Sequence, residues 1–338
     1  MNNRLNEFEK ISTALDALKD RQVDVLLESA RDHHTGIGGK SHLIEIEGTP
    51  VFVKKVPLTN LERQPNNVLS TSNLFDLPTC CQYGIGSPGF GAWRELSAHK
   101  ITTGWVKAGT CANFPLLYHS RTICGDTCSP VNLEPWGTID KFVGYWEDSP
   151  ALRRRVEELN GASAQILLFL EFVPHNLNAW LNAKLQEGGS SAEAALTMVD
   201  DQLTSAIEYM SSHGMIHFDA HFDNILTDGT TIYISDFGLA LSRDFTLSPA
   251  EQDFFKRHQS FDQSNAAINL LYCVVTSNFG KENWTEKLQE CIEGKRELPA
   301  YANAVVRKHG QTALAMAEFY RQVKVSKQVE YPVSLIVV

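Results

Sequence analysis

The 338-residue chain lacks any apolar run long enough to cross a membrane. Its first residues, Met1-Asn2-Asn3-Arg4, contain no apolar signal-peptide core. We therefore expect no membrane association and a cytoplasmic location.

The chain also lacks an excess of positive charge. It has 30 Lys and Arg residues against 40 Asp and Glu residues, a net charge of −10. This sign excludes non-specific attraction to nucleic acid or anionic lipid, so neither is an expected partner. The 43% hydrophobic and 21% charged composition is typical of a soluble protein with a sizeable core, long enough for one two-lobed domain or two ordinary ones.

Cysteine gives no framework for disulfides, because there are seven, an odd number. Three of them, Cys111, Cys124 and Cys128, lie in one region with His119 nearby, a grouping compatible with zinc. A convincing second ligand pair is missing, so reduced and unligated thiols are the favoured interpretation.

The most informative stretch is His217-Phe218-Asp219-Ala220-His221-Phe222-Asp223-Asn224, with Asp236-Phe237-Gly238 following. Between them, an apolar pair, an Asp-Gly turn and an alternating run predict a β-hairpin. Such a hairpin brings one carboxylate, one amide and a second carboxylate together. Phosphoryl transfer from a nucleotide uses this set, to orient the attacking hydroxyl and to hold Mg²⁺.

This pattern resembles the catalytic and metal-binding loops of the protein kinase superfamily. The resemblance implies that Asp219 is the catalytic aspartate, that Asn224 is a metal ligand and that Asp236 is the principal Mg²⁺ ligand. The alternative is a polar helix-to-strand turn that satisfies its own backbone.

A glycine-rich turn near residue 36 is expected between two strands, where backbone N–H groups can approach phosphate. The resemblance implies nucleotide contacts at five positions, of which Ser41 replaces the third glycine of the kinase pattern: Gly36, Gly38, Gly39, Lys40 and Ser41. A P-loop is excluded, because His34 stands where that motif needs glycine and a strand follows instead of a helix. A plain hairpin turn is the alternative.

The run Val51-Phe52-Val53-Lys54 resembles the kinase strand whose lysine reaches the ATP phosphates. Lys54 holds the motif position, and alternation sends Lys55 to the other face of the strand. A helix expected over 92–106 carries Glu95, which the resemblance implies to be the partner of that lysine. The alternatives are an ordinary strand-end lysine and a surface glutamate.

Two stretches, 57–90 and 108–150, lack periodicity and are interpreted as insertions. The first leads into a second glycine-rich run, 83–91, which we interpret as a flexible entry to the helix near Ala92. Phosphate binding at that helix start is the alternative.

The buried run 165–174 resembles the kinase hinge. By that resemblance Leu170 guards the back of the pocket, and Glu171 and Val173 supply backbone contacts to adenine. Helices are expected to begin near Asn176 and to cover 192–213, which leads into the catalytic loop.

Departures from the kinase pattern bear on the substrate and on regulation. Phe218 replaces the arginine that pairs with a phosphorylated activation loop, so that switch is expected to be absent. His221, in place of the usual lysine, resembles aminoglycoside and choline phosphotransferases. Residues 239–242 after Asp-Phe-Gly are similar to protein kinases, but only Ser248-Pro249-Ala250-Glu251 stands for Ala-Pro-Glu. Asp262 is expected either to brace the catalytic loop or to cap the helix over 262–275.

We therefore expect an α+β, bilobal protein-kinase-like fold, with a small β-rich amino-terminal lobe and a mainly helical carboxyl-terminal lobe. The expected parts are a helical extension (1–32, helical over 5–31), an amino-terminal lobe with the two insertions (33–173) and a carboxyl-terminal lobe (174–338) with a helix over 299–323. The apolar, β-prone stretch 331–338 is expected to extend a sheet edge, in this chain or in a partner.

The resemblance implies an ATP- and Mg²⁺-dependent enzyme that transfers the γ-phosphoryl group to a hydroxyl, with Ser or Thr of a protein as the favoured acceptor. The alternatives are a small-molecule phosphotransferase and a pseudokinase that binds nucleotide without turnover. The presence of all the expected chemical residues argues against the pseudokinase.

Overall fold

The computed structural model describes residues 2–28, 30–36, 39–84, 86–125, 128 and 130–333, and only the backbone of residues 2, 31–36 and 39–40. The chain forms two compact units. Unit 1 consists of Met1–Phe172, Phe237–Ala240 and Asp244–Ala250, and unit 2 of Val173–Asp236, Leu241–Arg243 and Glu251–Val338. Unit 1 contains a small antiparallel sheet and unit 2 is mainly helical, so the predicted α+β class is confirmed.

The sheet of unit 1 has five antiparallel strands in the order β1-β2-β3-β5-β4. They are β1 (Arg31–Gly36), β2 (Gly39–Ile46), β3 (Thr49–Leu58), β4 (Leu117–Cys124) and β5 (Ala164–Glu171). Glu47 and Gly48 connect β2 to β3 with φ angles of 52° and 80°, as the favoured two-residue hairpin turn requires. This tight turn sets Ser41 opposite Lys54 in the register.

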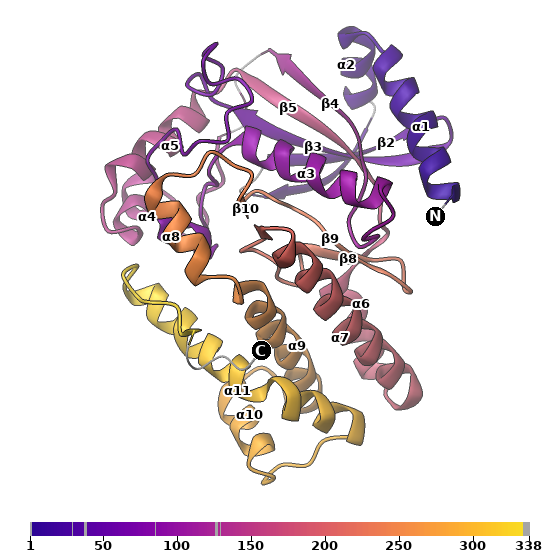
Figure 1. Ribbon diagram of the computed structural model, residues 1–338, viewed down its shortest axis with the longest axis vertical. Helices are drawn as coiled ribbons and strands as arrows, with labels where there is room; N and C mark the ends of the chain where they lie inside the picture. The colour runs from indigo at the N-terminus through magenta and orange to yellow at the C-terminus, as the bar shows by residue number, and fades with distance from the viewer. Residues whose placement is uncertain are drawn as a thin grey trace. The chain divides into compact units, whose positions relative to one another are not determined.

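Helix α3 (Ala92–Lys107) covers one face of this sheet (Figure 1). Trp93 and Leu96 of α3 pack into a cluster with Val56 and Leu58 of β3, and burial of each large side chain contributes about 2 kcal/mol. Because side chains alternate along a strand, Lys54 shares the face of Val56. The register of β3 therefore directs Lys54 toward α3.

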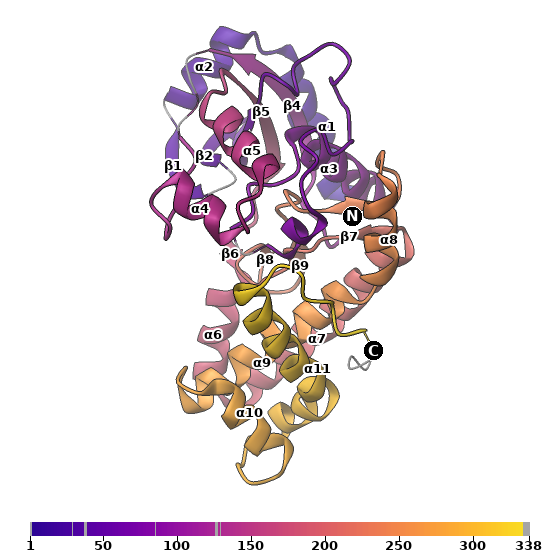
Figure 2. The same ribbon diagram turned by 90° about the vertical axis from the view of Figure 1, so that its left-hand side faces the viewer.

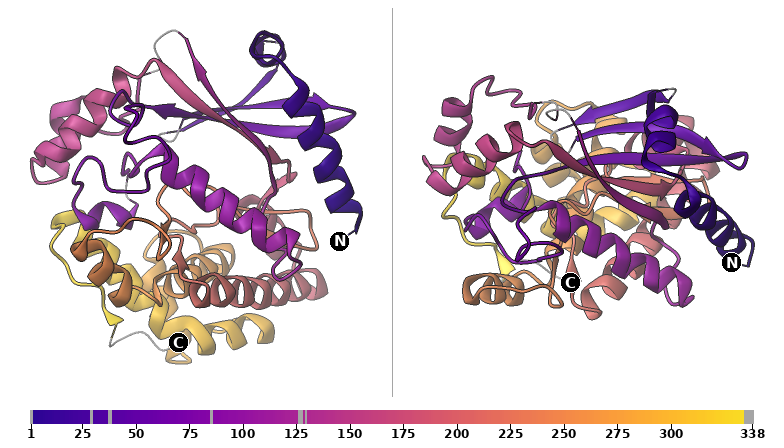
Figure 3. Two further views of the ribbon diagram at one scale, coloured as in Figure 1. Left: turned by 45° about the horizontal axis from the view of Figure 1, so that its top comes forward. Right: turned by 90° about the horizontal axis from the view of Figure 1, so that it is seen from above.

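Two amino-terminal helices, α1 (Asn2–Ala17) and α2 (Asp20–Glu28), contact β2 and β4 on the side of the sheet away from α3 (Figure 3). The segment expected to be helical over 5–31 forms these two helices, with a break at Leu18 and Lys19. The break has a tertiary cause, because Arg121 of β4 donates hydrogen bonds to the carbonyl oxygens of Leu15 and Leu18. Leu15 lies in the last turn of α1 and Leu18 directly follows its last residue, so Arg121 bonds carbonyl groups at the end of the helix.

The expectation that 108–150 is irregular is also wrong in part. Residues 117–124 form β4, the edge strand of the sheet, and Ile139–Tyr145 form α4. Helix α5 (Pro150–Asn160) follows, with Ser149 as its N-cap and proline in its first turn. The stretch 57–90 is irregular as expected, apart from β3 at its start and the 3₁₀ helix Thr79–Tyr83.

Unit 2 is built around helix α9 (Phe261–Phe279), which contacts four other helices (Figure 2). These are α6 (Leu177–Glu187), α7 (Gly189–Ser212), α10 (Trp284–Ile292) and α11 (Ala300–Val325). Short strands complete the unit: β6 (His175–Asn176), β7 (Met215–Ile216), β8 (Ile225–Thr227), β9 (Ile232–Ile234) and β10 (Leu241–Ser242). The sequence did not indicate α10, nor α8 (Pro249–Arg257).

The predicted hairpin is present as β8 and β9, with Ile225 opposite Ile234. Its turn forms because Asp228 Oδ1 accepts hydrogen bonds from the backbone N–H groups of Thr230 and Thr231, while Gly229 adopts φ 93°. The hairpin returns the chain to the end of the catalytic loop, since Asn224 O accepts from Ser235 N at 3.1 Å.

The stretch 331–338 was expected to extend a sheet edge, and its first residue, Tyr331, does not do so in this chain. Tyr331 joins no sheet edge; its ring packs against His258, Phe261 and Phe319, and its hydroxyl lies 2.9 Å from Ser264 Oγ. Residues 334–338 of the predicted edge segment lie outside the described part of the chain. Among the described residues, no helix combines the length and apolar character needed to span a bilayer.

Candidate functional site

The first group of predicted site residues lies in unit 1. Lys54 Nζ of β3 and Glu95 Oε1 of α3 are 2.7 Å apart, and both side chains are buried. Lys55 lies on the opposite face of β3 and is less buried. The fold thus brings together Lys54 and Glu95, the pair expected from the sequence. Their action on phosphate stays a prediction.

The predicted glycine-rich turn connects β1 to β2, with Gly36 opposite Gly39 in the register. Gly38 lies outside the described residues. Lys40 and Ser41 both belong to β2, and Ser41 is buried beside Lys54. Since a strand follows the turn, the exclusion of a P-loop agrees with the structure.

The second glycine-rich run ends at the first turn of α3. The alternative of phosphate binding there is wrong, because Glu62 Oε1 already accepts a hydrogen bond from Ala92 N at 2.7 Å. A carboxylate from the chain itself occupies the position that an anion would take.

The predicted hinge residues lie at and beyond the end of β5. Leu170 and Val173 are buried. Glu171 donates its backbone N–H to Leu116 O at 2.8 Å, and its carboxylate pairs with Arg4 at 2.7 Å and accepts from Leu116 N at 3.0 Å. Arg4 belongs to α1, so the amino-terminal helix contributes a charge to this segment. The predicted adenine contacts of Glu171 and Val173 stay predictions.

The second group of site residues lies in the catalytic loop of unit 2. Asn224 Nδ2 donates to the carbonyl oxygen and to Oδ2 of Asp219, both at 3.0 Å. His217 holds the start of this loop, since its Nδ1 accepts from Asp219 N and its Nε2 lies 2.9 Å from Ser235 O. His221 Nε2 lies 3.7 Å from Asp219 Oδ1. The loop thus brings the predicted catalytic aspartate and the predicted amide ligand into direct contact.

Asp262 braces this loop, which decides between the two roles considered for it. Its two carboxylate oxygens accept hydrogen bonds from His217 N at 2.6 Å and Phe218 N at 2.9 Å. Phe218 adopts φ 64°, which is costly for a bulky side chain and persists only where the surroundings enforce it. Burial, with a smaller contribution from the Asp219 charge, raises the pKa of Asp262 to about 7 against the lowering effect of the two N–H donors.

The chain passes from unit 2 to unit 1 between Asp236 and Phe237. Asp236 also has a positive φ, 62°, at the end of the hairpin that starts at Asn224. The Phe237 ring packs in unit 1 edge-on against His99, with centroids 4.9 Å apart, and 6.2 Å from Phe114. Since His99 lies one turn after Glu95, Phe237 contacts the helix that carries the predicted partner of Lys54.

The residues predicted to hold magnesium have suitable donor atoms. Because Asn224 donates through Nδ2, its side-chain oxygen is the atom with acceptor capacity, and Asp236 offers a carboxylate. Mg²⁺ is commonly bound by one or two such groups together with water and substrate phosphates. Within the described residues, no group of three or more His, Cys, Asp or Glu side chains could hold a metal, including around the cysteines.

Comparison with known proteins gives one family match. The family model described as protein kinase domain matches residues 147–254, which include β5, the catalytic loop, the hairpin and Asp-Phe-Gly. No curated protein matches the chain. With the α+β architecture of the two units, this match supports a kinase-like phosphotransferase and is consistent with a kinase-like bilobal fold. Residues 147–254 are thus similar to a protein kinase domain, which supports membership of the protein kinase superfamily and implies the use of ATP, usually with Mg²⁺.

Three residues near these groups were not singled out from the sequence: Arg4, Glu62 and Arg155. No local signal marks Arg4 or Arg155, because their partners are 167 and 93 residues away. Glu62 does carry a signal, since Thr59-Asn60-Leu61-Glu62 fits the capping-box pattern. The structure shows its reciprocal bonds, from Thr59 N to Glu62 Oε2 and from Glu62 N to Thr59 Oγ1.

Proposed function

We propose that this chain is a Mg-ATP-dependent Ser/Thr protein kinase. The observation that carries the proposal is the direct contact of Asp219 with Asn224 on a loop braced by Asp262. In this geometry the Asp219 carboxylate can orient a hydroxyl group. The side-chain oxygen of Asn224, which suits a metal ion, lies beside it.

The roles follow from each residue's surroundings. Lys54 presents a buried ammonium oriented by Glu95, suited to binding phosphate oxygens as a point charge. Asp219 accepts the proton of the attacking hydroxyl. Asn224 and Asp236 would hold Mg²⁺, which supplies charge neutralisation on the transferring phosphoryl group.

A protein acceptor is favoured by the segment after Asp-Phe-Gly. Residues 239–242 follow the protein kinase pattern, and Leu241 and Ser242 pair with Ile216 and Met215 beside the catalytic loop. This pairing supports an ordered segment next to Asp219, which a docking peptide requires.

A small-molecule acceptor is the second candidate. It is favoured by His221, which lies 3.7 Å from Asp219 Oδ1 where protein kinases have lysine. The α8 helix also follows the segment closely and leaves a short platform for a peptide.

Labelled ATP separates these functions. The purified chain is incubated with γ-labelled ATP and Mg²⁺, with either a generic protein acceptor or a mixture of aminoglycosides and choline. We expect label on Ser and Thr of the protein, and none in a matched Asp219→Asn reaction. Label in the small molecules alone would establish the second candidate. ATP binding without transfer to any acceptor would favour the pseudokinase.

Nucleotide binding has its own measurement. If Asn224 and Asp236 hold Mg²⁺, ATP raises the melting temperature only when the metal is present. One-site linkage gives about 2.7 kcal/mol of stabilisation at a hundredfold excess over the dissociation constant. An equal shift in EDTA would contradict the proposed metal site.

A further inference from the structure

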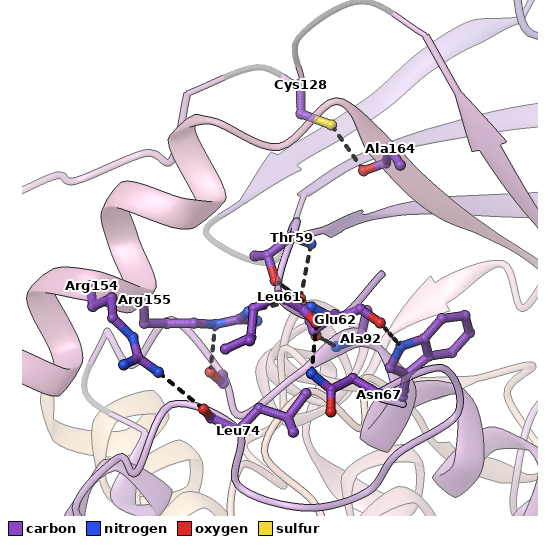
Figure 4. A network of polar contacts seen from close by, with 12 residues as sticks. Thr59, Leu61, Glu62, Asn67, Leu74, Ala92, Cys128, Arg154, Arg155 and Ala164 are labelled. Atoms are coloured by element: carbon purple, nitrogen blue, oxygen red, sulfur yellow. Dashed lines mark hydrogen bonds and ion pairs between the residues drawn. The ribbon is translucent and has the colours of Figure 1, made fainter. Parts of the chain in front are cut away.

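The amino-terminal end of α3 is held by a residue from the irregular stretch 57–90 (Figure 4). Glu62 Oε1 accepts from Ala92 N at 2.7 Å, and the Glu62 carbonyl oxygen accepts from Trp93 Nε1 at 2.9 Å. Gly91 permits this approach, because a Cβ at that position would lie 3.0 Å from Glu62 Oε1. Both the side chain and the backbone of Glu62 thus fix the first turn of α3.

The other carboxylate oxygen of Glu62 ties this turn to α5. It accepts from Thr59 Oγ1 at 2.7 Å and from Arg155 at 3.0 Å, and the Glu62 and Arg155 side chains are 1% and 3% exposed. Arg155 also donates to Gly89 O at 3.3 Å and lies over the Phe75 ring, 4.9 Å from its centroid. Burial alone raises the pKa of Glu62, but Arg155 and the hydrogen bonds outweigh it and lower that pKa below its ordinary value. Glu62 is therefore an ionised, fully buried anchor.

A second connection leads from α3 to the segment after Asp-Phe-Gly. Arg94, next to Glu95, donates to Thr71 O at 2.7 Å and lies 5.8 Å from the Phe245 ring centroid. Thr71 Oγ1 in turn accepts from Thr246 N at 2.9 Å. The stretch 57–90 thus contacts both α3 and residues 245–246, all within unit 1.

In protein kinases, phosphorylation of the activation loop controls whether the strand lysine and the helix glutamate are paired. The residue that commonly pairs with this phosphate is an arginine, and here an apolar side chain, Phe218, takes its place. Phe218 is buried, with its ring centroid 4.9 Å from Phe261 and 5.4 Å from Phe254. No side chain of this trio can pair with a phosphate.

We propose that Glu62 and Arg155 are positioning residues that hold α3 so that Glu95 stays paired with Lys54, and that this internal ion pair replaces activation-loop phosphorylation. Glu62 acts on Ala92, one turn before Glu95 on the same helix, so loss of the anchor releases the turn that carries the partner of Lys54. The kinetic part of this inference rests on the proposed phosphotransferase function; the positioning of α3 does not.

The test compares Arg155→Met with Arg155→Lys, which keeps the charge. The matched control is Arg153→Met, which removes an exposed arginine of the same helix. The first readout does not depend on catalysis: the rate at which an amine-reactive reagent labels Lys54, followed by mass spectrometry well below each variant's melting temperature. We expect Arg155→Met to raise this rate about 5–150-fold, the usual range for coupling between two sites. Arg155→Lys restores most of the protection, and Arg153→Met leaves the rate unchanged.

The second readout is phosphoryl transfer, with kcat and the KM for ATP measured separately. We expect Arg155→Met to lose a similar factor in kcat/KM, and phosphatase-treated wild type to keep full activity. Should Arg155→Met fail to fold, Glu62→Gln replaces it, because glutamine keeps an oxygen for Ala92 N and puts an NH₂ group, which cannot accept from Arg155, in place of Oε2.

The outcomes separate the two claims. Wild-type Lys54 labelling in a folded Arg155→Met or Glu62→Gln protein overturns the positioning role. Loss of wild-type activity on phosphatase treatment overturns the replacement of phosphorylation. Absence of transfer by wild type, with Lys54 labelling changed as expected, refutes the proposed function and leaves the positioning role supported.

Discussion

Replacement of Asp262 by alanine is the perturbation whose effect follows most directly from the structure. It removes the acceptor of two buried backbone N–H groups, those of His217 and Phe218. Each unsatisfied buried donor costs about 1–3 kcal/mol, so we expect the free energy of unfolding to fall by about 2–6 kcal/mol at pH 5. The exposed Asp253→Ala variant on α8 is the control and should change stability little.

The pH dependence of this effect has a defined sign. The pKa of Asp262 is raised from 3.8 to about 7 in the folded chain, so the folded state binds its proton more tightly than the unfolded state. Its contribution to stability is therefore fully present below about pH 4 and decreases as the pH rises to about 7. The difference between wild type and Asp262→Ala should accordingly shrink over this window.

Urea denaturation measures these differences, and hydrogen exchange of the His217 and Phe218 amides shows where they arise. Turnover should fall as well, because Asp219 follows the braced residues directly, and a misplacement of 1 Å can cost about 10²-fold. Two results would refute the reasoning: unchanged stability of Asp262→Ala at pH 5, or a loss that grows from pH 5 to pH 8.

Three further predictions concern single side chains. Lys54→Met should impair ATP-dependent turnover and Lys55→Met should not, because the two side chains leave opposite faces of β3; reversed kinetics would contradict the register. Burial lowers the pKa of His258 to about 4, so its stabilising effect is present above pH 6.5 and is lost as the pH falls toward 4. In urea denaturation His258→Phe should therefore gain about 3 kcal/mol relative to wild type over that window, and a pH-independent difference would argue against it. Arg4→Met should lower the melting temperature measured by calorimetry, because Arg4 pairs with the part-buried Glu171 carboxylate, whereas an unchanged value would mean that the pair contributes nothing.

Elements with a strong apolar pattern could be predicted from the sequence. Strands β3 and β5, the helix over 92–106 and the hairpin after Asn224 were predicted. Strand β5 is a nearly continuous buried apolar run, and the hairpin has a diagnostic Asp-Gly turn. Strand β4 was missed because His119, Ser120, Arg121 and Thr122 give an edge strand the composition of a loop.

Contacts between distant residues could not be predicted in the same way. Arg121 donates a hydrogen bond to the last turn of α1, more than 100 residues away in the sequence. Arg155 pairs with Glu62, which is 93 residues away. Asp262 was compatible with both a cap and a brace, since a first-turn aspartate suits either. Only the placement of His217 and Phe218 above its carboxylate decides between them.

The central claim, that this chain transfers a phosphoryl group with Asp219 as the residue that orients the acceptor hydroxyl, is tested most directly by turnover and ATP affinity of Asp219→Asn. The account predicts nearly unchanged ATP binding and turnover lower by about 10²–10⁴, the contribution of a positioned general base. The companion variant Asp236→Asn should lose affinity and rate together, as expected for a metal ligand. Wild-type turnover by Asp219→Asn would contradict the account.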